Sequence, residues 1–231
     1  MRDDEIDDLL NKAGSAQHEV DPRVLDRIAE SIRPTTHPVR TLPSPILWAT
    51  GLVLICASVA VAGAATLGFA GLHNLNTVQR AGIFISLAVI VWFAALSCVA
   101  ECVPGSRRHI TPGRLLGFGS LILICAFAAV FRSYATDRFL SQGVRCLTAG
   151  LAHAAVAALS FWILLRRGFA VNPTAAGLAI GTLAGLAGIV MLELHCANFE
   201  VPHVVLWHTA VIWVAAAAAM LGVKMWRDRF R

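Results

Sequence analysis

Six long apolar stretches, each nearly free of charged side chains, constrain this chain more than any other feature. They are Ile46–Leu67, Ala81–Ala100, Leu115–Phe131, Val144–Leu165, Thr174–Leu194 and Val204–Met225. A helix needs about 20 apolar residues to cross a hydrocarbon layer about 30 Å thick, and these stretches have that length. Because unpaired backbone groups are not tolerated in lipid, each stretch is expected to be helical. The sequence therefore predicts an all-α, polytopic membrane protein with six transmembrane helices.

The composition indicates a lipid bilayer as the environment of residues 45–231. Hydrophobic residues make up 57% of the chain and charged residues only 14%, whereas soluble domains carry about 25% charged residues. The net charge of +5 does not indicate direct nucleic-acid binding, because the basic residues are spread over short loops and the C-terminus. In those places they orient a membrane protein.

The basic residues near the helix ends predict the orientation of the chain. If the N-terminus is cytoplasmic, that side carries twelve of them, namely Arg27, Arg33, Arg40, Arg107, Arg108, Arg114, Arg166, Arg167, Lys224, Arg227, Arg229 and Arg231. The opposite side carries only Arg80, Arg132, Arg138 and Arg145. Because basic residues gather on the cytoplasmic side of membrane proteins, both termini are expected there.

Residues 1–44 form a polar N-terminal tail that precedes the membrane domain, residues 45–231. Two short amphipathic helices are expected in it, and Asp21, Pro22 and Pro34 mark the start and end of the second. Their apolar faces contain Ile6, Leu9 and Leu10 in the first helix and Val24, Leu25, Ile28 and Ile32 in the second. The tail has nine acidic residues against six basic ones, which favours a protein partner with a basic rim over a membrane surface. A partly disordered tail without a partner stays open.

Cys146 and Cys196 are the residues most indicative of a functional site. They lie at the start and end of two consecutive apolar stretches, which should form a hairpin and return both thiols to the outer side of the membrane. His195 adjoins Cys196, and thiolate with imidazole suits zinc or copper. Four interpretations stay open: a structural disulfide, plain packing, redox or metal sensing with Cys146, Cys196 and His195, and catalysis.

The sequence carries no signature of an enzyme. A glycine-rich phosphate loop, a serine nucleophile elbow, a zinc protease motif and a C-x-x-C pair are absent from it. Cys98 and Cys102 are one helical turn apart and supply only two ligands, so unlinked thiols are expected there. Gly177, Gly181 and Gly185 repeat every four residues, a spacing that lets a neighbouring helix pack closely.

The C-terminal half resembles a known family. The order Cys146, Leu164–Gly168, Asn172–Gly177, Leu194–Cys196 and Leu206–Trp207 is similar to that of the NrsF family. These are six-helix anti-sigma factors of the bacterial inner membrane, named as negative regulators of sigma F. The chain departs from the family pattern at Phe169, at His208, where a tyrosine commonly follows the tryptophan, and at Ala197–Phe199.

The resemblance implies a protein that holds an extracytoplasmic-function sigma factor at the membrane through its tail. It also implies that Cys146 and Cys196 take part in sensing heavy metal or oxidative stress, with a transient metal ion and no resident cofactor. The alternative is a small membrane transporter or a thiol-redox membrane enzyme, which would need no cytoplasmic partner. The sequence leaves the oligomeric state and the particular sigma factor open.

Overall fold

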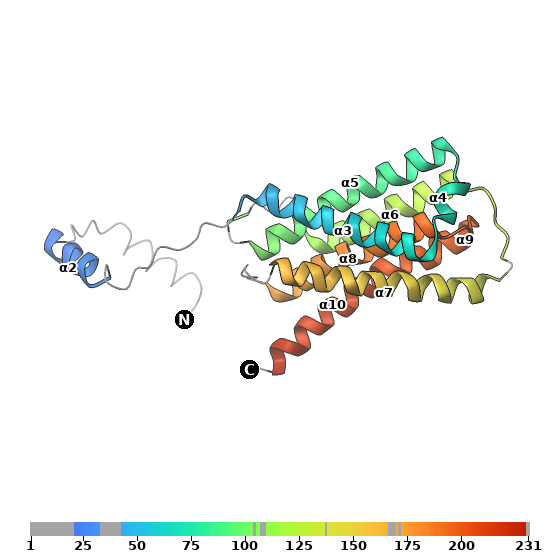
Figure 1. The fold of residues 1–231 in the computed structure, drawn as a ribbon. Coiled ribbons are helices and arrows are strands. Elements are labelled where there is room, and N and C mark those ends of the chain that lie inside the picture. The colour runs from blue at the N-terminus through green and yellow to red at the C-terminus, as the bar shows by residue number, and fades with distance from the viewer. Residues whose placement is uncertain are drawn as a thin grey trace, which may run out of the picture. The chain divides into compact units, whose positions relative to one another are not determined.

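The computed structural model describes residues 21–32, 43–103, 105–106, 110–136, 138–165, 170 and 172–229. The chain divides into two compact units, residues 1–42 and 43–231, and each is described by itself. All regular secondary structure among the described residues is helical (Figure 1). The predicted all-α fold is therefore confirmed.

The second unit is a helical bundle. Its elements are α3 (Pro45–Leu67), α4 (Ala70–Asn74), α5 (Thr77–Cys102), α6 (Pro112–Val130), α7 (Phe139–Leu165), α8 (Pro173–His195), α9 (Val201–His203), the π-helical turn η2 (Val204–His208) and α10 (Thr209–Arg229). Six spans among the described residues are long and apolar enough to cross a membrane: α3, α5, α6, α7, α8 and the continuous segment Val201–Met225. Each coincides with one predicted stretch apart from a few residues at its ends.

Polar caps followed by proline set the start of several of these helices. The Ser44 hydroxyl accepts a hydrogen bond from the backbone N–H of Leu47, and Pro45 occupies the first turn of α3. Asn172 caps α8 in the same way, with its side-chain oxygen 3.1 Å from the N–H of Ala175. Proline fits this position because the first helical N–H groups have no partner within the helix.

Helix α8 forms the centre of the bundle. It packs against α3, α5, α6, α7 and α10, and most of its residues are buried. Most of its buried side chains are small or aliphatic, and only Thr182 and Glu193 add polar groups to the buried part. A helix that is apolar all round is expected at the core of a bundle rather than at its surface.

The glycines of α8 bring it into backbone contact with α10. A Cβ atom at Gly181 would lie 2.5 Å from the carbonyl oxygen of Ala215, and one at Gly185 would lie 2.5 Å from Cα of Ile212. At Gly177 the carbonyl oxygen of Ala219 would be 3.0 Å away. Only glycine permits an approach this close, as at small-residue interfaces of other membrane helices.

In the first unit the described element is α2 (Pro22–Ile32), which confirms the second predicted helix of the tail. The Asp21 carboxylate accepts a hydrogen bond from the N–H of Arg23 at its start. Val24, Leu25 and Ile28 are 39%, 53% and 48% exposed. The other predicted partner-binding residues, Ile6, Leu9, Leu10 and the side chain of Ile32, lie outside the described part of the chain.

Candidate functional site

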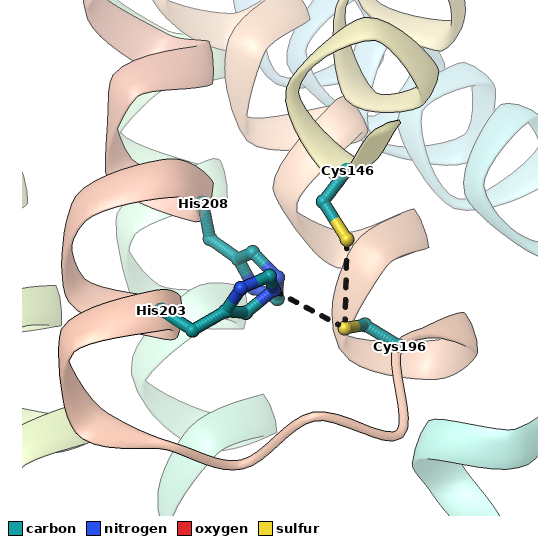
Figure 2. Close-up of side chains that lie close together, drawn as sticks. All are labelled: Cys146, Cys196, His203 and His208. Atoms are coloured by element: carbon teal, nitrogen blue, oxygen red, sulfur yellow. Dashed lines mark hydrogen bonds between the residues drawn. The ribbon is translucent and has the colours of Figure 1, made fainter. Parts of the chain in front are cut away.

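Four side chains from different elements meet at one end of the bundle and form what we call the thiol–imidazole cluster: Cys146, Cys196, His203 and His208 (Figure 2). Each residue offers one potential ligand atom, a cysteine Sγ or a histidine ring nitrogen, and these four atoms all lie within 4.8 Å of one another. Cys146 is partly buried, and the other three residues are buried. Sequence reasoning singled out the two cysteines, and the structure brings them together.

The two cysteines are free thiols in van der Waals and hydrogen-bond contact. Cys146 lies near the start of α7, and Cys196 follows the last residue of α8. Their Sγ atoms are 3.6 Å apart, and the Sγ of Cys196 is also 3.6 Å from Nε2 of His203. Figure 2 shows both contacts, with dashed lines that join Cys196 to Cys146 and to the His203 imidazole. Cys196 is therefore the central member of the cluster.

The short loop after α8 is held in place by several contacts, and these position Cys196 against His203. The side-chain amide of Asn198 donates a hydrogen bond to the Gln142 side chain at 2.7 Å. The Phe199 ring stacks on Phe131 with centroids 5.2 Å apart. At the end of the loop the N–H of Val201 donates to the carbonyl oxygen of Ser133 at 2.7 Å. The loop thus bridges α6, α7 and α8.

The π-helical turn η2 places His203 and His208 on the same side. Residues five positions apart point about 140° apart on an α-helix, which would leave only one of them beside the cysteines. In a π turn the chain is wound more loosely, with i to i+5 hydrogen bonding. The two imidazole rings consequently meet edge to face, with centroids 5.4 Å apart.

A buried carboxylate orients His208. Its Nδ1 lies 2.6 Å from Oε1 of Glu193, and both side chains are 1% exposed. Among the described residues, Nε2 of His208 and Nδ1 of His203 have no hydrogen-bond partner. Because buried polar atoms are normally paired, a free Nε2 in this position is an unusual feature of the cluster.

The hydrogen bond between the Cys196 and Cys146 thiols raises the pKa of Cys196 above its usual value, and burial raises it further. Contacts with His203 and His208 lower the pKa of Cys196 and partly offset these effects. Cys196 therefore holds its proton at neutral pH. An oxidant or a metal ion must remove that proton before the sulfur can react or coordinate.

The cluster is accessible from one side. Cys146 and Cys196 line an open pocket of about 300 Å³, together with Gln142, Arg145 and Asn198. Small ions and oxidants can reach the sulfur atoms by this route, while His203 and His208 are buried and do not line the pocket. The arrangement suits capture of a soft metal ion or oxidation of the thiol pair.

His195, which the sequence predicts as a third metal ligand, is not part of the cluster. Its Nδ1 lies 3.0 Å from the carbonyl oxygen of Gly68, and the structure groups His203 and His208 with the cysteines instead. The sequence did contain a signal for these two residues. The spacing Cys196, His203, His208 includes an H-x₄-H pair, which falls within the range found in zinc sites.

A family model matches residues 34–227, and its description is negative regulator of sigma F. This chain belongs to the NrsF family. The NrsF match covers all six candidate spans and the thiol–imidazole cluster but begins after α2. The description names negative regulation of a sigma factor, which is the role of an anti-sigma factor. No curated protein and no solved structure matches the chain.

Proposed function

We propose that this NrsF protein is an anti-sigma factor of the bacterial inner membrane that holds an extracytoplasmic-function sigma factor through residues 1–44. Both termini lie in the cytoplasm, and the thiol–imidazole cluster lies on the outer side. A change at Cys146 and Cys196 lowers the affinity of the tail for the sigma factor and releases it. Family membership supports the regulatory role. The observation that carries the sensing role is the pair of free thiols, 3.6 Å apart, that line an open pocket.

The apolar face of α2 is the proposed contact with the sigma factor. Val24, Leu25 and Ile28 are exposed on one side of an 11-residue helix. A helix this short is marginal in water on its own, so a partner groove that buries the face would stabilise both the helix and the complex. The acidic excess of the tail favours a partner with basic residues beside that groove.

Two inputs are chemically compatible with the thiol pair. Hydrogen peroxide would oxidise both thiols to one disulfide and be reduced to two water molecules, the thiol protons ending in those waters. A soft metal ion would displace the thiol protons and bind both sulfur atoms. Either event draws the start of α7 and the end of α8 into a fixed geometry. The protein with reduced, metal-free thiols and the protein after oxidation or metal binding must differ in their free energy of sigma-factor binding. A difference of about 5.5 kcal/mol converts a mostly bound sigma factor into a mostly free one.

The deciding experiment uses the full-length protein in lipid nanodiscs as bait in an extract of its own bacterium. The proposal expects recovery of a sigma factor, and a bait that recovers none would overturn it. Leu25→Gln with Ile28→Gln should weaken the complex more than tenfold, because each buried side chain of this size contributes about 1.5–3 kcal/mol. Arg23→Gln places the same side chain about 140–160° around α2 from Leu25 and Ile28 and should leave the affinity unchanged.

A further inference from the structure

We infer that the thiol–imidazole cluster is a four-ligand metal site of the Cys₂His₂ type, in which His203 and His208 bind a zinc-class ion together with Cys146 and Cys196. This inference deepens the proposed function, because it assigns the ligands and the ion class of the same sensing site. It adds two ligands that the cysteine pair alone does not supply. One of them, His208, stands at a position where the NrsF family resemblance leads one to expect tyrosine.

The distances within the cluster approach those of a tetrahedral site. Zinc binds cysteine sulfur at about 2.3 Å and histidine nitrogen at about 2.0–2.1 Å, which places neighbouring ligand atoms about 3.3–3.8 Å apart. The Cys146 to Cys196 and Cys196 to His203 distances are both 3.6 Å. All four ligand atoms lie within 4.8 Å of one another. Closing the site around an ion therefore needs shifts of about 1 Å, which side-chain rotation can provide.

The surroundings of His208 match those of a metal-bound histidine. Metal-ligating histidines commonly donate their second ring N–H to a carboxylate, which fixes the ring and leaves the other nitrogen for the ion. Glu193 accepts such a hydrogen bond at Nδ1, and Nε2 of His208 has no hydrogen-bond partner within the described structure. The orphan nitrogen of a fully buried imidazole is an independent sign that a ligand belongs there.

The charge of the site also favours a divalent ion. A buried cation is costly unless opposite charges compensate it. Two thiolates from Cys146 and Cys196 neutralise one divalent ion, and two protons leave the site as it binds. Sulfur and imidazole ligands disfavour magnesium and calcium, which prefer oxygen.

A consequence is that the two inputs exclude each other. In a zinc complex each thiolate donates electron density to the ion and becomes less nucleophilic, and a disulfide removes both thiolate ligands. Zinc binding should therefore protect Cys146 and Cys196 from peroxide, and prior oxidation should abolish zinc binding while leaving the imidazoles intact. The same four residues can therefore respond either to metal, by binding it, or to oxidant, by forming a disulfide.

The test is X-ray absorption at the zinc edge on the full-length protein in nanodiscs loaded with one equivalent of Zn²⁺. The inference expects two sulfur and two nitrogen neighbours at the tetrahedral distances. A spectrum with the two sulfur atoms and only oxygen neighbours, or no stoichiometric binding, would overturn it. Neither result bears on sigma-factor capture, so failure of the site and failure of the proposed function are distinguishable.

Variants locate the nitrogen ligands. His208→Asn keeps an N–H at the position of Nδ1 for Glu193 but lacks Nε2, so the fold is retained while a ligand is lost. His208→Asn and His203→Asn should each weaken Co²⁺ or Zn²⁺ binding more than tenfold and change the tetrahedral Co²⁺ visible spectrum. His195→Asn, next to Cys196 but directed to Gly68, is the matched control and should bind metal as the unaltered protein does. Equal affinity in all three variants would contradict the assignment.

Discussion

Glu193 and His208 form a fully buried hydrogen bond of 2.6 Å that joins the end of α8 to the turn η2. The contact links the central helix of the bundle to the segment that carries both imidazoles of the cluster. Glu193 lies three residues before Cys196, so the same end of α8 orients a thiol and an imidazole. A displacement of α8 would alter both at once.

Removing one partner of this pair should destabilise the protein markedly. Glu193→Ala leaves a buried imidazole without its acceptor, and breaking a buried pair costs about 3–5 kcal/mol. The double variant Glu193→Ala with His208→Ala removes both polar groups and should lose less than the sum of the two single changes. Unfolding of the protein in detergent, followed by circular dichroism, measures these differences. Additive losses would show that the two side chains act independently.

Packing of α8 against α10 leads to a second prediction. Gly185→Ala places a Cβ atom against the backbone of Ile212, so α10 must shift. Overpacking of this kind costs about 1–3 kcal/mol. Gly117→Ala in α6 meets no atom within 4 Å and should be neutral or slightly stabilising, since alanine favours helix by up to about 1 kcal/mol. Equal thermal stability of the two variants in detergent would contradict the close contact.

Most of the bundle is predictable from sequence, because the length and low charge of each apolar stretch leave no alternative to a membrane-spanning helix. Caps such as Asn172 with Pro173 also mark the helix starts within a few residues. The cluster was only half predictable. Side chains of neighbouring residues on a helix point about 100° apart. His195 therefore does not point into the cluster although it is next to Cys196 in the sequence. His208 could be placed only once the π turn was known, since α-helical spacing turns it away from His203.

The pKa of Cys196 leads to a third prediction. The contact with Cys146 is the largest cause of its raised pKa, so Cys146→Ala should lower that pKa. Because the thiolate is the reactive form, the pH midpoint for alkylation of Cys196 should move to lower pH. The measurement uses protein in which the other four cysteines are replaced by serine, with and without Cys146→Ala. A rate increase with an unchanged midpoint would indicate better access alone, and Ser141→Ala provides a control on the same helix.

The two thiols should also control the response in cells. With a reporter gene under the cognate sigma factor, Cys146→Ser and Cys196→Ser should each abolish induction by peroxide and reduce induction by Zn²⁺ at least tenfold. Cys125→Ser, at an exposed position in α6, is the matched control and should respond normally. A full response in both site variants would remove the thiol pair from the signalling mechanism. Immunoblots of membrane fractions ensure that all three variants accumulate equally.

The orientation predicted by the basic residues can be tested at the C-terminus and at the loop between α6 and α7. Twelve basic residues on one side against four on the other predict that residue 231 is cytoplasmic and that this loop is external. A green fluorescent protein fused after Arg231 should fluoresce, and alkaline phosphatase inserted after Ala135 should be active. Exchanging the two reporters should silence both. The reverse pattern would place Cys146 and Cys196 in the reducing cytoplasm, where oxidation of the pair would not persist.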